Sequence, residues 1–191
     1  MKRPSSRAEA SARTKRVAVS GMMIALGVII LYVGSLIEVL DISMAAIASL
    51  LCIVAVIEYG RGYAVMVYAA TALVAMLVLP EKFTPSLYAI LIGYYPIVKE
   101  LIERMGKKSF KKVLGAVRWA VKLAFFNVAF LAFALVAIYL LVLPETEEWM
   151  KITMFLLANV TFVVYDVALT RLISFYIFRV RPRLRLPGGR R

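Results

Sequence analysis

Long apolar runs constrain this chain more than any other feature of its sequence. A helix needs about 20 mostly apolar residues to cross a bilayer, and several runs approach that length. The 191-residue chain is 63% hydrophobic with a mean hydropathy of +0.86, whereas soluble domains are about 45–50% apolar. The pattern lacks the alternating segments of about 10 residues that are typical of a membrane β-barrel. The sequence therefore predicts an all-α integral membrane protein, a six-transmembrane-helix bundle with approximate spans Val17–Ile37, Ile42–Glu58, Tyr63–Leu79, Ser86–Glu103, Trp119–Leu143 and Trp149–Phe178.

The distribution of basic residues predicts how the bundle sits in the membrane. Lys and Arg concentrate in the N-terminal tail, in the segment after the fourth run and in the C-terminal tail, whereas two of the other connections are acidic. Because basic segments stay in the cytoplasm, we expect both termini on that side. Residues 1–16 are predicted to be a disordered basic cytoplasmic tail, 17–178 the six-helix transmembrane domain and 179–191 a second basic cytoplasmic tail.

The strong positive charge points to the membrane as a partner and away from nucleic acid. The formal net charge is +13, and the basic residues lie between apolar runs and at both ends. That placement is explained by topology and by attraction to anionic lipid headgroups.

Several classes of chemistry have no residues to support them in this sequence. The chain has no histidine and only one cysteine, Cys52, which lies inside an apolar run. The absence of histidine excludes His-ligated haem, the common zinc sites and Ser-His-Asp catalysis. There is also no P-loop, GxSxG or HExxH motif. We therefore expect no enzyme activity, no metal and no cofactor.

The fourth run, Leu87–Arg104, combines a backbone break with ionisable groups. Pro96 has no N–H for the carbonyl one turn before it, and Gly93 precedes it, so the helix is expected to bend there. Lys99 and Glu103 are spaced i, i+4, as are Glu100 and Arg104. Such pairs are explained by side chains that reach the membrane interface at the end of a span.

Asp166 is the ionisable residue that is hardest to dismiss, because it lies well inside the sixth run. An acid at that depth is normally turned inward and paired. The candidate partners are Lys99 of the fourth run, or Lys122 and Arg118 of the fifth. Two interpretations stay open, a structural clasp between helices and a role in moving substrate or protons. Glu58, at the end of the second run, is expected to pair with Arg61.

Small residues line one face of each of the first two runs. In the first, Ala18, Gly21 and Ala25 follow i, i+3, i+7 spacing. The second run has a similar stripe at Ala45, Ala48, Ser49, Cys52 and Ala55. Small residues let two helices approach closely, either within one bundle or against a partner membrane protein.

In these features the chain resembles the substrate-binding (S) components of energy-coupling factor vitamin transporters. The resemblance rests on the size, on six spans with both ends inside, on the face formed by Ala18, Gly21 and Ala25, and on the segment from Ile57 to Ala70, IEYGRGYAVMVYAA. It implies that this face docks a coupling membrane subunit that works with separate ATPases in a prokaryotic cytoplasmic membrane. It also implies a small-molecule pocket on the outer side, carried over to Lys82, Tyr88, Asn127, Trp149 and Asn159.

Two other functions are consistent with the residues. One is a non-transporting membrane scaffold, such as a cell-envelope assembly factor of the rod-shape type. The other is a small secondary transporter that works alone and uses Lys99 and Asp166 as an intramembrane charge pair.

Overall fold

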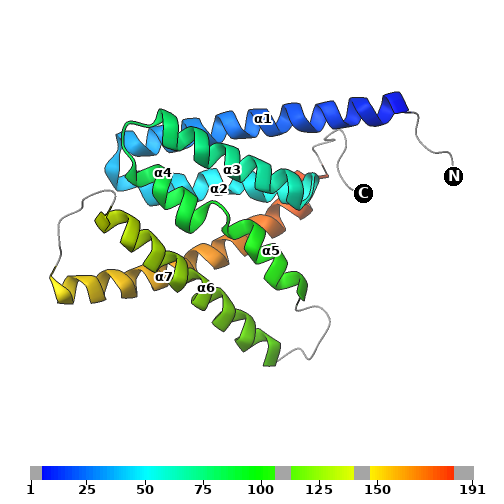
Figure 1. Ribbon diagram of the computed structural model, residues 1–191. Helices are drawn as coiled ribbons and strands as arrows, with labels where there is room; N and C mark the ends of the chain where they lie inside the picture. Colours follow the sequence, from blue (N-terminus) through cyan, green and yellow to red (C-terminus); the bar gives the residue numbers. More distant parts are fainter. Residues whose placement is uncertain (1–5, 106–112, 140–146, 183–191) are drawn as a thin grey trace.

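The chain is helical throughout the part that the structure, a computed structural model, describes. This part comprises residues 6–105, 113–139 and 147–182, and it contains no strand. The helices in chain order (Figure 1) are α1 (Ser6–Leu36), η1 (Glu38–Leu40), α2 (Asp41–Glu58), α3 (Arg61–Val78), α4 (Phe83–Leu87), the π-helical turn η2 (Tyr88–Ile92), α5 (Tyr95–Met105), α6 (Val113–Tyr139), α7 (Glu148–Phe175) and the π-helical turn η4 (Tyr176–Val180).

Five helices in the described residues are long and apolar enough to cross a membrane: Arg13–Leu36, Asp41–Glu58, Arg61–Val78, Gly115–Tyr139 and Glu148–Val180. They correspond to five of the six predicted spans. The predicted fourth span is not one continuous helix, because it is divided into α4, η2 and α5. This architecture is consistent with a multi-pass membrane protein.

The helices α1, α2 and α3 pack against one another, and the broken segment α4–η2–α5 lies against α2 (Figure 1). The stripe of small residues on α2 is buried within this group, at Ala45, Ala48, Ser49, Cys52 and Ala55. The chain turns between α2 and α3 at Gly60, whose φ of 90° lies in the region that favours glycine.

The break in the fourth segment has two backbone causes, and tyrosine side chains compensate for both. The Gly93 N–H donates to the Tyr88 carbonyl at 2.7 Å, one residue farther back than in an α-helix, and this leaves the Ala89 carbonyl free. The hydroxyl of Tyr68 on α3 donates to that carbonyl at 2.7 Å. Pro96 has no N–H for the Ile92 carbonyl, which instead accepts the Tyr165 hydroxyl at 3.4 Å.

The N-terminal tail differs from the prediction. Helix α1 begins at Ser6 and its first turns project beyond α2 and α3 (Figure 1), so residues 6–16 are helical instead of disordered. The helix of the first span continues straight through this segment because the segment contains Ala and Arg, which are good helix formers. Residues 1–5, and residues 183–191 of the predicted C-terminal tail, lie outside the described part of the chain.

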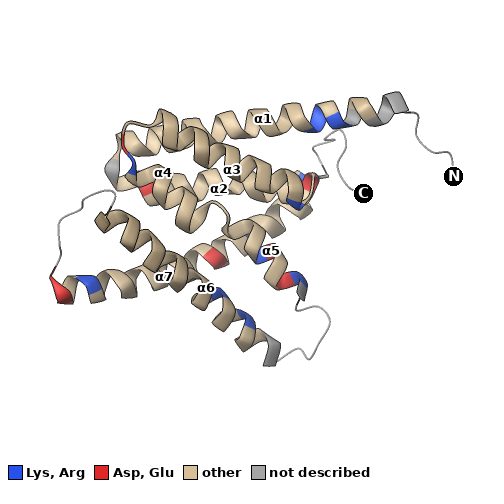
Figure 2. Ribbon diagram, viewed as in Figure 1, with Lys and Arg blue, Asp and Glu red and all other residues tan. Residues whose placement is uncertain are grey.

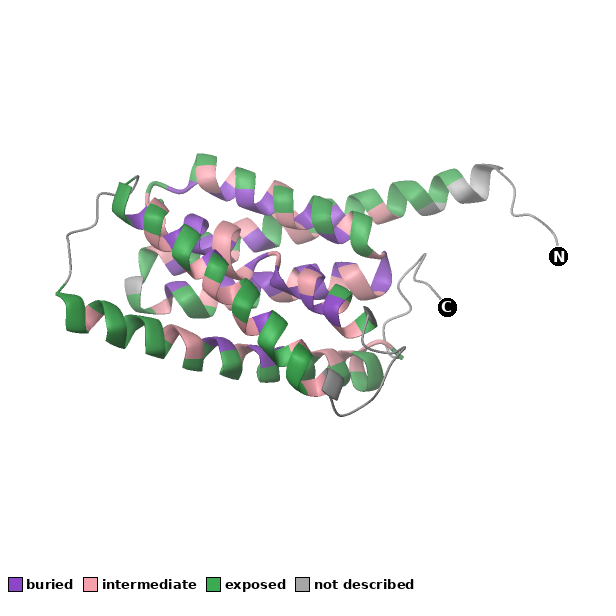
Figure 3. Ribbon diagram, turned by 60° about the horizontal axis from the view of Figure 1, so that its bottom comes forward, coloured by how far each residue is buried: buried purple, intermediate pink, exposed green. Residues whose placement is uncertain are grey.

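The first half of α7 is exposed on every face, at residues 151–157 (Figure 3). Large exposed side chains there include Ile152, Phe155 and Leu156. In a membrane these side chains would contact lipid tails, so their exposure is not costly.

Candidate functional site

Charged side chains from three helices meet inside the bundle where α5, α6 and α7 come together. Figure 2 shows an acidic position on α7 away from both of its ends. Asp166 lies inside this helix, nine residues before its end at Phe175. Asp166 is joined there by Lys99 and Glu103 of α5 and by Lys122 of α6. The side chains of Lys99, Asp166 and Lys122 are 1%, 3% and 8% exposed, whereas that of Glu103 is 42% exposed. We call these four residues the ionic cluster.

Lys99 has all its hydrogen-bond donors satisfied by α7. Its Nζ lies 2.5 Å from Oδ1 of Asp166, 2.9 Å from the Asp166 backbone carbonyl oxygen and 2.8 Å from Oγ1 of Thr170. A lysine ammonium has three donors, and α7 accepts all three. Glu103 adds a carboxylate oxygen 3.4 Å from the same Nζ.

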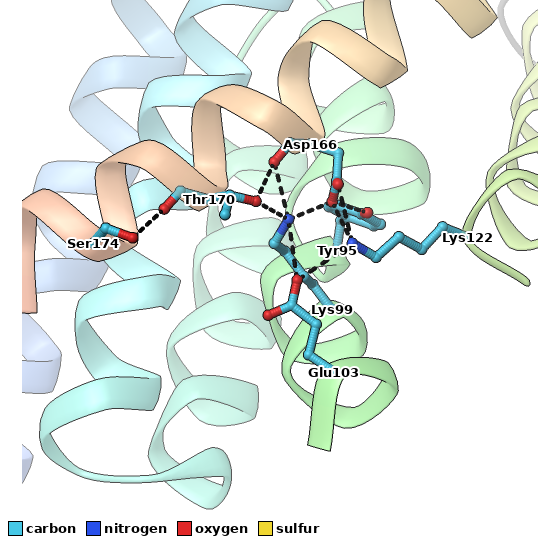
Figure 4. Close-up of polar contacts among 7 residues, drawn as sticks. All are labelled: Tyr95, Lys99, Glu103, Lys122, Asp166, Thr170 and Ser174. Carbon is cyan, nitrogen blue, oxygen red and sulfur yellow. Dashed lines mark hydrogen bonds and ion pairs between the residues drawn. The ribbon is translucent and has the colours of Figure 1, made fainter. Parts of the chain in front are cut away.

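Lys122 approaches Asp166 from α6, as Figure 4 shows. Its Nζ lies 3.0 Å and 3.1 Å from the two carboxylate oxygens of Asp166, and 3.3 Å from Glu103. The same ammonium stands 5.4 Å from the ring centroid of Trp119, within cation–π range. The Tyr95 hydroxyl donates to Oδ1 of Asp166 at 2.5 Å.

Helical spacing explains why these groups converge. Tyr95, Lys99 and Glu103 follow one another at four-residue intervals, which places them on one face of α5. Asp166 and Thr170 have the same spacing on α7. Because α5 begins anew at Tyr95, after the break at Gly93, this face can be turned toward α6 and α7.

The ionic cluster contains two cations and two carboxylates, so its formal charge is balanced. Buried charges are tolerated when they are paired and hydrogen-bonded, and removal of one partner leaves an uncompensated charge. Chemically the cluster can clasp three helices together, and it can also take up or release a proton if its balance is disturbed.

The structure thus brings Lys99 and Asp166, the predicted charge pair, into direct contact. Lys99 and Lys122 were alternative partners of Asp166 in the prediction, and the structure shows that both bind its carboxylate at the same time. Sequence reasoning missed Tyr95 as a member of this site. The signal that could have found it is its four-residue spacing from Lys99.

The five residues predicted to line an outer substrate pocket do not form one site. Only Asn127 and Asn159 bond to each other, with Nδ2 of Asn159 donating to Oδ1 of Asn127 at 3.1 Å. Lys82 donates to the carbonyls of Met76 and Leu79 at 2.8 Å and 2.6 Å, so its ammonium is used at the end of α3. Tyr88 is buried in the core, and its hydroxyl lies 3.4 Å from Sγ of Cys52. Trp149 is 65% exposed.

The face predicted to dock a partner is uncovered. Ala18, Gly21 and Ala25 are exposed, and a Cβ built on Gly21 would meet no atom within 4 Å. The small residues of α1 that pack inside are others, such as Gly27, whose added Cβ would lie 2.9 Å from Thr71.

The ion pair predicted for Glu58, at the C-terminal end of α2, is wrong. Glu58 is buried and pairs with Arg181 just after η4, at 3.1 Å, and not with Arg61. Arg61 instead lies 3.5 Å from Glu100. The sequence pattern favoured the neighbour three residues away because it could not show that the C-terminal end of α7 reaches the end of α2.

The fold and the site define an all-helical type of protein with a buried ionic cluster, and its long apolar helices are consistent with a multi-pass membrane protein. Within the described residues no group of three or more Cys, Asp or Glu side chains is arranged to hold a metal ion. Comparison of the chain with family models, with curated proteins and with solved structures finds no match.

Proposed function

We propose that this protein is the membrane-embedded substrate-capture subunit of an uptake transporter for a small, vitamin-like molecule. In this proposal the chain crosses the cell membrane six times, with both termini in the cytoplasm. Separate ATPases and a coupling membrane subunit supply the energy, and the chain itself catalyses no reaction.

The observation that carries the proposal is the difference between the two small-residue faces. The stripe on α2 is buried by packing inside the bundle, whereas Ala18, Gly21 and Ala25 on α1 are exposed within the part of the chain that the structure describes. Lipid tails are as apolar as a leucine side chain, so association in a membrane depends on close packing of helices. An uncovered face of Gly and Ala favours a second membrane protein as its occupant.

The ionic cluster fits this proposal as a clasp. It ties α6 and α7 to α5, and α5 packs on α2. A subunit braced in this way can rock as one body against a coupling partner.

Purification of the tagged protein from its native membrane tests the proposal. We expect an ATPase and a second membrane protein to co-purify, and Gly21→Leu to reduce their recovery. Gly115→Leu is the matched control, because a Cβ on Gly115 also meets nothing within 4 Å but lies on α6. If no ATPase co-purifies, or if Gly21→Leu retains the partners as well as wild type, the proposal fails.

A second candidate function is a secondary transporter that works alone, and the burial of Lys99 and Asp166 favours it. It predicts pH-dependent uptake by the purified protein in liposomes, lost in Asp166→Asn. Absence of both that uptake and the ATPase partner would leave the membrane scaffold as the remaining class.

A further inference from the structure

A cleft of about 400 Å³ lies beside the ionic cluster, between α2, α5 and the end of α7. Its apolar lining consists of Pro96 of α5 and of branched aliphatic side chains, namely Ile53, Val56 and Ile57 of α2, Ile173 of α7 and Ile177 of η4. This volume lies within the range of roughly 300–1,000 Å³ that is usual for ligand sites. The cleft therefore offers a largely apolar compartment, and Lys99 and Glu103 of the ionic cluster form part of its wall.

Charged residues also line the cleft, Lys99 and Arg104 together with Glu100 and Glu103, and Arg61 adjoins them through its ion pair with Glu100. Glu100, which lines the cleft, is shared by two guanidinium groups, with Arg61 at 3.5 Å and Arg104 at 3.7 Å. The side chains of Arg61 and Arg104 are 46% and 65% exposed. Two guanidinium groups against one carboxylate leave a positive charge and N–H donors directed to the surroundings, the arrangement that binds phosphate. The other carboxylate of the cleft, Glu103, is already held by Lys99 and Lys122.

The cleft has an apolar interior beside a cationic mouth and lies at the end of membrane-spanning helices. These properties suit an amphiphilic ligand. We propose that the cleft binds one anionic phospholipid from the surrounding bilayer. Its acyl chain would lie against the isoleucines of α2 and η4, and its phosphate would bind Arg61 and Arg104. The choice of an anionic headgroup rests on charge complementarity with these two arginines, since basic pockets between helices attract such lipids. This site is independent of the proposed transport function.

Native mass spectrometry of the full chain in detergent, titrated with dioleoyl phosphatidylglycerol, tests the inference. We expect one lipid to stay bound to wild type and the double variant Arg61→Gln/Arg104→Gln to bind it about tenfold more weakly, a change of about 1.4 kcal/mol. Ile177→Trp should have a similar effect, because its larger ring would enter the apolar part of the cleft. Arg171→Gln is the control, since it removes an exposed charge of α7 that does not line the cleft.

Two further arms separate the parts of the ligand. Phosphatidylcholine should bind more weakly than phosphatidylglycerol, and soluble glycerol phosphate should not compete. Equal binding of lipid by wild type and the arginine double variant would overturn the inference. Equal binding of the two lipids would contradict selection of the headgroup by the arginines. Effective competition by glycerol phosphate would contradict a contribution of the apolar cleft to binding.

Discussion

The Lys122 ammonium of α6 lies 3.0 Å from Oδ2 of Asp166 on α7, and this pair is a polar tie between these helices. The amide hydrogen bond of Asn159 to Asn127 is another, seven residues earlier on α7. Much of the remaining surface of both helices is exposed apolar side chain. Because burial of apolar groups drives little association in lipid, these polar ties carry much of the specificity of α6–α7 packing.

Replacement of Asp166 by asparagine should destabilise the protein strongly. The change leaves Lys99 and Lys122 buried with only the carboxylate of Glu103 nearby. Removal of one partner from a buried ion pair costs about 3–5 kcal/mol in free energy of unfolding. Unfolding can be followed with a thiol-reactive fluorophore, because the one cysteine, Cys52, is buried. Glu148→Gln, which breaks the exposed pair with Lys151, is the control and should leave the melting temperature unchanged. A melting temperature for Asp166→Asn equal to that of this control would refute the clasp.

Removal of one cation together with the acid should cost less than removal of the acid alone. The double variant Lys99→Met/Asp166→Leu leaves Lys122 and Glu103, which already lie 3.3 Å apart, as a balanced pair. Apolar replacement of a buried ion pair is often close to neutral. We therefore expect its loss of stability, measured in the same thiol assay, to be smaller than that of Asp166→Asn. A double variant less stable than the single one would show that charge balance is not what the cluster provides.

The apolar runs were sufficient to predict an all-helical chain and the positions of its five long helices, because run length and turn residues are local properties. They were not sufficient for the fourth segment. Gly93 and Pro96 predicted a bend, but the hydrogen bond that the Ala89 carbonyl of the π-helical turn accepts comes from Tyr68, which lies on α3 and is distant in sequence.

The candidate site shows the same division between local and tertiary information. The pairing of Lys99 with Asp166 could be proposed because an acid in an apolar run needs a cation, whatever the fold. The outer pocket could not be judged in this way, since the inward burial of Tyr88 and the use of Lys82 at the end of α3 are set by tertiary packing. For the same reason the sequence paired Glu58 with Arg61, whereas in the structure Glu58 pairs with Arg181 and Arg61 with Glu100.

Gly93→Ala should destabilise the break in the fourth segment. A Cβ at this position would lie 2.7 Å from Cζ of Tyr88 and 2.8 Å from its carbonyl oxygen, and Tyr88 is buried and cannot move aside freely. Overpacking of this kind costs about 1–3 kcal/mol. Gly115→Ala in α6 meets no atom within 4 Å and should be neutral or stabilising by up to about 1 kcal/mol, because alanine is the better helix former. Thermal unfolding of the two variants side by side measures the difference, and equal melting temperatures would argue against the close contact.

Tyr68→Phe should loosen the same segment with little change in side-chain volume. The variant keeps the aromatic ring but removes the hydroxyl that donates to the Ala89 carbonyl at 2.7 Å. A side-chain hydrogen bond inside a membrane protein contributes about 0.6–2 kcal/mol, and here the carbonyl has lost its helical partner to the π-helical turn. We expect faster hydrogen exchange at the amides of residues 88–94 and a lower melting temperature. Tyr63→Phe, on the same helix, is the matched control, because its hydroxyl makes no hydrogen bond to any of the described residues. Unchanged exchange in Tyr68→Phe would mean that the π-helical turn is held by packing of Tyr88 and Gly93 alone.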